Sequence, residues 1–143
     1  MKIGIASDHG GFEIKQILKD HLEKNNYTII DFGNFEINPE DDYPDFVIPL
    51  AKAVAKNEVD RGIAVCGSGV GASIAANKIK GVRAGLVHDN YSAHQGVEDD
   101  NMNVLCMGGR IVGSDKAIEL ALTFIEAKFS HGERHIRRLG KIE

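Results

Sequence analysis

Apolar residues alternate along the chain between short β-rich runs and longer amphipathic stretches. The short runs are almost wholly apolar, as strands covered on both faces would be, and glycine or polar residues bound them. In the longer stretches apolar residues recur three and four positions apart, which is typical of one helix face. This pattern predicts strands at residues 2–7, 28–32, 62–66, 83–87 and 103–107, and helices near residues 14–22, 47–55, 72–79, 91–98 and 117–125.

Strands that alternate with helices predict an α/β fold with a five-stranded parallel sheet between two helical layers. The 143 residues fit one domain, and no internal repeat or linker divides residues 1–143. The longest irregular stretch, residues 34–45, contains two prolines that disfavour regular structure. Residues 131–143 form a basic tail on an otherwise acidic body.

Unusual residues follow several of the predicted strands directly. In parallel α/β sheets, ligands bind beyond the carboxyl ends of the strands. We therefore expect four loops to meet in one crevice. These loops comprise residues 8–11, 66–71, 88–90 and 108–110.

Composition and charge exclude several classes of protein. The chain has 17 basic and 21 acidic residues, a net charge of −4, whereas a protein that binds the nucleic-acid backbone usually carries a basic excess. No run of about 18 apolar residues could span a membrane, and Asp8 interrupts the N-terminus before a signal peptide could form. Two cysteines make no disulfide framework, so we expect a reduced cytoplasmic setting.

The most informative motif is Cys66-Gly67-Ser68-Gly69-Val70-Gly71, which joins the third predicted strand to the next helix. Its glycines let the backbone turn sharply and approach a ligand closely. The helix N-terminus behind them offers unpaired N–H groups, which favour an anion or an oxyanion formed in a reaction. In this position Cys66 is favoured as a thiolate that acts as base or nucleophile. The alternative is that Cys66 is only a small apolar residue of the strand.

Three familiar motifs nearly match this loop. Gly67, Gly69 and Ala72 fit the loose dinucleotide fingerprint, with an acidic residue about 20 positions further on, but no second domain exists for a redox substrate. A phosphatase loop would need arginine in place of Ala72, and the Walker lysine is absent. We therefore favour a glycine loop without a dinucleotide. Zinc motifs of the His-Glu-x-x-His or Cys-x-x-Cys type do not occur, so we predict no metal.

Two further groups of polar residues are candidates for binding. Asp8 and His9 follow the first strand directly; Asp8 could instead cap a helix, whereas His9 suits acid–base chemistry or contact with phosphate. Arg134 and Arg138 would share one helix face and could grip a phosphate, although a basic run is usually only a solvated surface.

The remaining histidines and the second cysteine have simpler interpretations. His21 lies on the apolar face of the first helix, and Cys106 ends an apolar strand, so we expect both in the core. The segment 88–90 could contact a ligand or cap a helix, and the pattern does not decide between these roles.

Six blocks of sequence together resemble the type B ribose-5-phosphate isomerases, in order and across essentially the whole chain. The superfamily also includes galactose-6-phosphate isomerase subunits. The resemblance implies a Rossmann-like fold, a homodimer or homotetramer, and no metal or organic cofactor. It implies interconversion of an aldose and a ketose phosphate through a cis-enediolate. The blocks are SDHGGF, DYPD, CGSGVGASIAANK, GVRAG, MNVLCMGGRIVG and GERHIRR.

The resemblance also assigns roles to individual residues. Cys66 matches the catalytic base that moves a proton between neighbouring carbons, and Ser68 lies near the reacting oxygens. The backbone N–H groups that would hold the enediolate belong to Gly67, Gly69, Val70 and Gly71. Residues that match positions in contact with sugar or phosphate, or polar positions near the crevice, are Asp8, His9, Tyr43, Asn77, Asn103, Arg110, Arg134 and Arg138. The two tail arginines are expected to act at a partner subunit's site.

One departure from the family affects the choice of substrate. Many members have His-Asn where this chain has Asp99-Asp100, and that histidine is assigned to opening the furanose ring, while the asparagine helps bind the enediolate. A carboxylate can exchange protons if an apolar setting or a neighbouring carboxylate raises its pKa. Either Asp99 opens the ring, or another group such as His94 does, or the substrate has no stable ring.

The sequence therefore predicts an isomerase of a small phosphorylated sugar, ribose 5-phosphate first. The alternatives are a four- or six-carbon sugar phosphate such as galactose 6-phosphate, a non-catalytic module that binds phosphosugar or nucleotide, and a subunit active only with a partner chain. We expect neither nucleic acid nor membrane as a partner.

Overall fold

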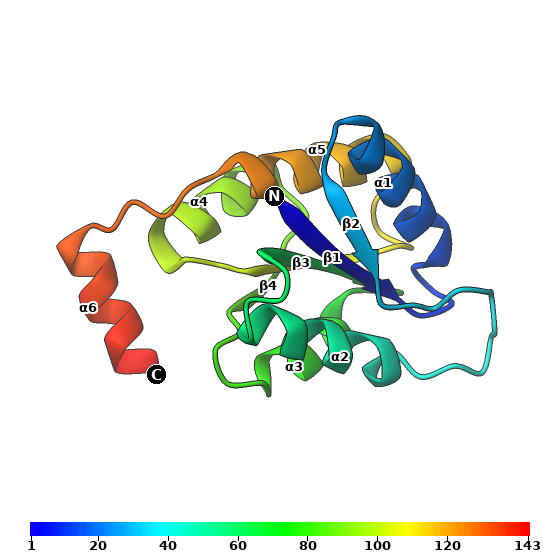
Figure 1. Cartoon of the computed structure of the whole chain (residues 1–143), viewed down its shortest axis with the longest axis horizontal. Coiled ribbons are helices and arrows are strands. Elements are labelled where there is room, and N and C mark those ends of the chain that lie inside the picture. The colour runs from blue at the N-terminus through cyan, green and yellow to red at the C-terminus, as the bar shows by residue number, and fades with distance from the viewer.

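Five parallel strands form a single sheet in the order β2-β1-β3-β5-β4, which confirms the predicted α/β class. The computed structural model describes all 143 residues. Helices and strands alternate until α5, and one further helix ends the chain (Figure 1). Their bounds are β1 Lys2–Ser7, α1 Phe12–Lys24, β2 Thr28–Asp31, α2 Pro44–Ala55, β3 Arg61–Cys66, α3 Val70–Asn77, β4 Ala84–Leu86, α4 Asn90–Asp100, β5 Val104–Gly108, α5 Ser114–Glu126 and α6 Glu133–Ile142.

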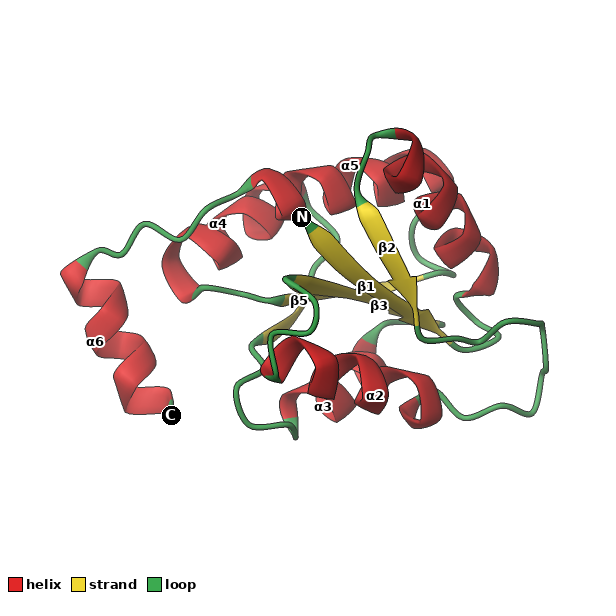
Figure 2. Cartoon of the chain, in the orientation of Figure 1, coloured by secondary structure: helices red, strands yellow, loops and turns green.

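Two helical layers cover the sheet, with α1, α4 and α5 on one face and α2 and α3 on the other (Figure 2). Side chains alternate between the layers along each strand, because successive residues of a strand point to opposite faces. In β3, Ile63 and Val65 pack toward α1 and α5, whereas Ala64 and Cys66 pack toward α2 and α3. Both faces of β3 are thereby buried, as its unbroken apolar run predicts.

The order of the strands sets the position of the site. β1 lies between β2 and β3, so the connection to β2 runs to one side of β1 and the later strands are added on its other side. Such a reversal opens a crevice at the carboxyl ends of the two strands. Ser7 pairs with Val65 in register, so the loops that follow β1 and β3 begin side by side.

Two elements differ from the sequence prediction. α2 begins at Pro44, three residues before the predicted start, because proline fits the first turn of a helix, where its missing N–H costs nothing. The basic tail, in which we expected only that Arg134 and Arg138 would share a helix face, forms a full helix, α6, over residues Glu133–Ile142. Its apolar positions Ile136 and Leu139 lie three apart on one face, but α6 buries no residue and lies apart from the sheet.

None of the helices combines the length and the apolar character that are needed to cross a bilayer. Cys106 is fully buried, as predicted. His21, in contrast, is only partly buried in the last turn of α1, where its positive form would suit the helix C-terminus.

Candidate active site

The loop between β3 and α3 holds the Cys66 thiol at a helix N-terminus. Gly69 caps α3 with a φ of +84°, a left-handed conformation that favours glycine. Its N–H donates to Cys66 Sγ at 3.2 Å, an interaction that stabilises a thiolate. The first hydrogen bond of the helix runs from Ser73 N to Gly69 O at 3.0 Å. The amide groups of the preceding turn are therefore not used by the helix itself.

Neighbouring loops hold this turn in place. Gly109 N donates to Cys66 O at 2.7 Å, and Arg110 N donates to Gly67 O at 3.1 Å. The loop after β1 packs equally tightly, because a Cβ at Gly10 would lie 2.8 Å from Gly67 N. Three of the four loops predicted to converge thus meet around Cys66.

A pocket of about 400 Å³ opens beside the thiol. Cys66 is only 5% exposed, yet it lines this pocket rather than pointing solely into the core. The pocket brings together residues that lie far apart in the sequence, and all of them except Ile111 are candidates from the sequence. Its lining comprises Asp8, Tyr43, Cys66, Gly67, Ser68, Gly71, Arg110 and Ile111.

Close backbone approach fixes two walls of the pocket. The Tyr43 ring packs directly on Gly71, where a Cβ would lie 2.5 Å from the ring carbon Cζ. The Arg110 guanidinium lies over Gly67, with Nη1 3.4 Å from the position of a Cβ there. The phenol of Tyr43 and the guanidinium of Arg110 therefore line the same pocket as the thiol and pack against the glycines of its loop.

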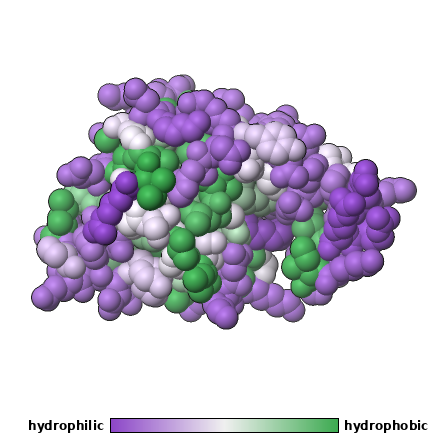
Figure 3. All heavy atoms as spheres, turned by 180° about the vertical axis from the view of Figure 1, so that it is seen from behind, coloured by the Kyte–Doolittle hydropathy of each residue, from purple (hydrophilic) through white to green (hydrophobic).

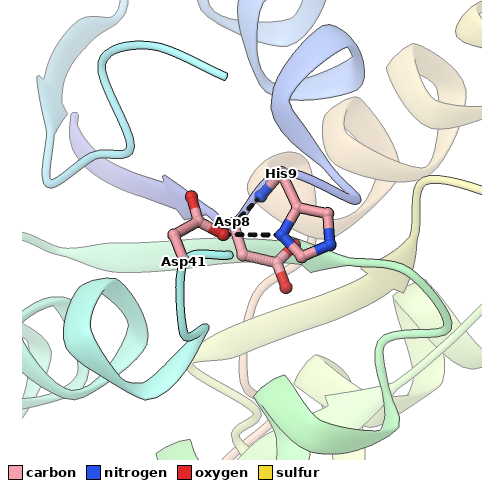
Figure 4. Close-up of side chains that lie close together, drawn as sticks. All are labelled: Asp8, His9 and Asp41. Carbon is pink, nitrogen blue, oxygen red and sulfur yellow. Dashed lines mark hydrogen bonds and ion pairs between the residues drawn. The ribbon is translucent and has the colours of Figure 1, made fainter. Parts of the chain in front are cut away.

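Asp8 and His9 stand beside this pocket together with Asp41, a residue that sequence reasoning missed (Figure 4). Asp8 does not cap α1, whose N-cap is Gly11; its Oδ1 accepts the N–H of Gly10 at 2.8 Å. Asp41 comes from the long loop before α2 and accepts from His9 Nδ1 at 2.7 Å. In the sequence, only the DYPD block next to Asp41 indicates that this loop reaches the site.

The loop after β4 has structural roles instead. His88 Nε2 accepts the N–H of Gly108 at 2.9 Å. Asp89 caps α4 by accepting the N–H of Ser92 at 2.8 Å, and this bond lowers the pKa of the Asp89 carboxyl. The choice between ligand contact and capping is thus decided for Asp89, which is a cap.

Asn77 and Asn103 lie at the opposite edge of the sheet from the Cys66 pocket. Asn77 exchanges two hydrogen bonds with the backbone of Ala84 at 2.8 and 2.9 Å. Asn103 accepts from Arg83 N at 2.7 Å and donates to Gly81 O at 3.0 Å. The structure therefore places both amides in turns at the start of β4 and β5, rather than near the crevice where the family pattern led us to expect them.

The remaining candidates form a second group around α4 and α6. Asp99 accepts from Gln95 Nε2 at 2.9 Å, and its Oδ1 lies 3.3 Å from His135 Nε2. Asp100 lines a cavity of about 520 Å³ between α4, β4 and α6, while Arg134 and Arg138 are exposed on α6. None of these four candidates lines the Cys66 pocket of the same chain.

The second group borders an apolar surface. Met102, Leu139 and Ile142 line the 520 Å³ cavity. Seen from behind, hydrophobic side chains lie along the hollow between α6 and the body (Figure 3). One side of α6 is therefore apolar and uncovered, while its arginines are presented to solvent.

Comparisons with known proteins agree over the whole chain. A family model described as Ribose/Galactose Isomerase matches residues 3–142. The ribose-5-phosphate isomerase B of Clostridium thermocellum is 47% identical with a TM-score of 0.95, and the match covers 99% of this chain and 95% of that one.

Two further relatives differ in their named substrates. The ribose-5-phosphate isomerase B of Mycoplasma genitalium, solved with bound ribulose 5-phosphate, is 43% identical with a TM-score of 0.94, covering 99% and 93% of the two chains. A D-erythrulose-4-phosphate isomerase of Mycolicibacterium smegmatis is 38% identical, covering 90% and 86%. The chain therefore belongs to the ribose/galactose isomerase family, in its type B ribose-5-phosphate isomerase group, and is a sugar-phosphate isomerase.

Proposed function

We propose that this protein interconverts ribose 5-phosphate and ribulose 5-phosphate, with Cys66 as the base that moves the proton. The observation that carries the proposal is the Cys66 thiol in a 400 Å³ pocket, bonded to the N–H of Gly69. A relative that shares 43% of its residues with this chain was solved with bound ribulose 5-phosphate. Proton transfer next to a carbonyl needs one poised base and one site for the developing oxyanion, and this loop supplies both.

The reaction is proposed to proceed in three proton transfers. The Cys66 thiolate removes the proton from C2 of the open-chain aldose, and the electron pair of that C–H bond forms the C1–C2 double bond of a cis-enediolate. The resulting thiol returns the proton to C1, while the proton of the C2 hydroxyl is transferred to the oxygen at C1. Ser68 would lie near these oxygens, and the amides of residues 67 and 69–71 would hold the negative charge, with the N–H groups of Gly69 and Val70 turning to it from Cys66 Sγ and Ser68 Oγ.

We propose that a second copy of the chain completes the site, in a homodimer or homotetramer. Arg110 is the only cation that lines the Cys66 pocket, whereas Arg134 and Arg138 extend from a helix that buries no residue of its own. The uncovered apolar side of α6, with Leu139 and Ile142, would pack on the partner. The arginines would then reach the partner's pocket and hold the phosphate, and Asp99 with Asp100 would arrive with them.

A four-carbon sugar phosphate is the second candidate for the substrate. Asp99, the residue at the position assigned to ring opening, is a carboxylate that lies 3.3 Å from His135 Nε2. Asp99 and His135 together could exchange a proton with a furanose ring, which would suit a five-carbon substrate. A substrate without a stable ring would need no such group, and a D-erythrulose-4-phosphate isomerase is among the relatives.

The decisive test is a panel of four-, five- and six-carbon aldose phosphates, assayed in a reducing buffer with and without a chelator. We expect ribose 5-phosphate to have the highest kcat/KM, and the chelator to have no effect, because the proposed chemistry uses no metal. A reducing assay also matches the cytoplasmic setting that we propose for a catalytic thiol.

Cys66→Ala tests the base directly, with Cys106→Ala as the matched thiol control. We expect kcat of Cys66→Ala to fall by a factor of about 10² or more, the range typical of a lost general base, while the protein stays folded. Near-normal turnover in this variant would remove Cys66 as the base. Tight nucleotide binding without turnover of any sugar phosphate would favour the non-catalytic alternative.

A further inference from the structure

Asp41 makes two separate hydrogen bonds to His9. Its Oδ1 accepts the backbone N–H of His9 at 3.0 Å and lies 2.7 Å from Nδ1 of the ring (Figure 4). The Asp41 side chain is only 8% exposed, whereas that of His9 is 29% exposed. The nearly buried carboxylate of Asp41 thus bonds the partly exposed imidazole of His9. Both lie close to Asp8, which lines the Cys66 pocket.

This contact determines which ring nitrogen carries a proton. An ionised carboxylate can only accept hydrogen bonds, so Nδ1 of His9 must be the donor. Nε2 is then the nitrogen left for a ligand, and it accepts a bond in neutral imidazole and donates one in imidazolium. In this structure no protein group is bonded to His9 Nε2.

Asp41 is itself held by groups that reach into the core. Its Oδ2 accepts from Asn34 Nδ2 at 2.9 Å, and Asn34 is 3% exposed. Ser7 donates to Asn34 Oδ1 at 3.0 Å, at the end of β1. The carbonyl of Asn34 accepts from Lys15 Nζ, and Lys15 is fully buried against Asp31.

Asp8, His9 and Asp41 also have the residue types of a metal site, with donor atoms within 4.8 Å of one another. The ligand atoms of this cluster that face one another, however, already make hydrogen bonds within the protein. Both oxygens of Asp41 accept N–H groups, His9 Nδ1 donates to Asp41, and Asp8 Oδ1 accepts from Gly10. A metal ion would have to break these bonds, so the geometry favours an oriented histidine.

We propose that Asp41 is a positioning residue for His9, fixing the ring so that Nε2 meets a polar group of the phosphorylated substrate. The long loop before α2 is then part of the binding machinery, and Asn34 with Lys15 anchors it. The kinetic part of this inference rests on the proposed function. The tautomer of His9 does not, and it can be measured without any substrate.

The first experiment is ¹H–¹⁵N correlation spectroscopy of the histidine rings at a pH where His9 is neutral, with His9→Gln used to assign the peaks. We expect the proton on Nδ1 of His9 in the wild-type protein, and a loss of that preference in Asp41→Ala. Asp41→Asn keeps an acceptor oxygen and should restore part of the preference. Glu40→Gln removes the same charge from the adjacent exposed residue and should change nothing.

The second experiment is a double-mutant cycle on the preferred sugar phosphate. Asp41→Ala should raise KM about tenfold, the size of one charge-assisted hydrogen bond, with a smaller effect on kcat. If Asp41 acts through His9, the pair His9→Gln with Asp41→Ala should be no worse than His9→Gln alone. Thermal melts confirm that each variant is folded.

Two outcomes would overturn the inference: a proton on Nε2 in neutral wild-type His9, or a KM loss from Asp41→Ala that persists in the His9→Gln background. If no sugar phosphate is turned over, the proposed function fails. The ring spectra then still decide whether Asp41 positions His9.

Discussion

Cys66 and Cys106 share one face of the sheet but occupy very different environments. Cys66 borders the pocket and accepts the N–H of Gly69. Cys106 is fully buried, and that burial raises the pKa of its thiol, with a further contribution from Cys66 nearby. Position along neighbouring strands thus separates a thiol that can react from one that only packs.

Alkylation should therefore distinguish the two thiols. We expect iodoacetamide to modify Cys66 in the folded protein and to leave Cys106 unmodified, with activity lost in step with the single adduct. Peptide mass spectrometry gives the site of each adduct, and Cys106→Ala serves as the control that should keep the inactivation. Early modification of Cys106 would contradict this assignment.

Lys15 is the residue whose role the hydrophobic pattern hides most completely. It is fully buried, and its Nζ lies 2.9 Å from Asp31 Oδ1 and 5.6 Å from the centre of the Phe12 ring. Lysine is rarely buried without a partner, because removing its charge from water costs free energy. The same Nζ also donates to the carbonyl of Asn34 and so holds the loop that contains it.

Lys15→Met should lower the free energy of unfolding by about 3 kcal/mol, because it removes the buried positive charge that pairs with the nearly buried Asp31 carboxylate. Lys19→Met is the matched control, since Lys19 is 36% exposed and its Nζ lies 3.8 Å from the same carboxylate. We expect a loss below about 1 kcal/mol there, as for most exposed pairs. Urea denaturation measures both, and equal losses would contradict the importance of burial.

At the residue scale, the sequence predicts the pocket better than it predicts the network behind it. Asp8, Tyr43, Cys66 and Arg110 stand out from sequence motifs, and the structure brings them together. Asp41 does not stand out, because its partner His9 lies 32 positions away and the path of the intervening loop follows no periodicity. The register of the strands decides which of these loops lie side by side, and that register exists only in the folded sheet.

At the scale of elements, α4 shows how one side chain fixes where a helix begins. Asp89 is extended, and its carboxylate accepts the N–H of Ser92. This bond satisfies a donor that the first turn would otherwise leave free. Because the bond lowers the pKa of Asp89, the ionised form is the stabilising one.

The contribution of Asp89 to stability should therefore depend on pH. A carboxyl whose pKa is lower in the folded state than in the unfolded state stabilises the fold fully at a pH above its unfolded-state pKa, which is near 4. This stabilisation is lost as the pH falls through the lowered, folded-state pKa. We expect Asp89→Ala to lower the Tm by a few degrees at pH 7 and by less near pH 3. Asp115→Ala is the control, because no side chain caps α5. A pH-independent difference in Tm would contradict the capping role.

The elements themselves follow closely from the pattern, with the exception of α6. All five strands and the first five helices lie where periodicity places them, within a few residues at each end. Pro44 disfavours regular structure in the sequence pattern, yet at the start of α2 it is compatible with the helix. The sequence indicates a helix in the basic tail only through the spacing of Arg134 and Arg138, because α6 has few apolar residues and buries none of them in this chain.

At the scale of the whole molecule, α6 is the element least explained by a single chain. It lies apart from the sheet, with Ile136 50% exposed and Ile142 75% exposed. We propose that this uncovered apolar helix face is a site of association. Our proposal that a second copy covers it makes assembly a condition for full activity.

Leu139→Asp should separate the subunits, because it places a charge on the apolar side of α6. We expect a monomer in analytical ultracentrifugation and a loss of kcat/KM of at least about tenfold, since the tail arginines no longer reach a partner's pocket. Arg137→Gln changes an exposed charge of the same helix and should leave both assembly and activity intact. A fully active monomer would contradict the shared site.

The pairing of β1 with β3 has a consequence for how the protein acquires its activity. The loops that carry Asp8 and Cys66 lie 58 residues apart, and they meet only once Ser7 and Val65 are in register. Parallel pairing of this kind requires closure of long loops and is a slow, non-local event in folding. Nascent or nicked chains should consequently have no isomerase activity until β1 and β3 have paired. The appearance of turnover would then show that the sheet is complete.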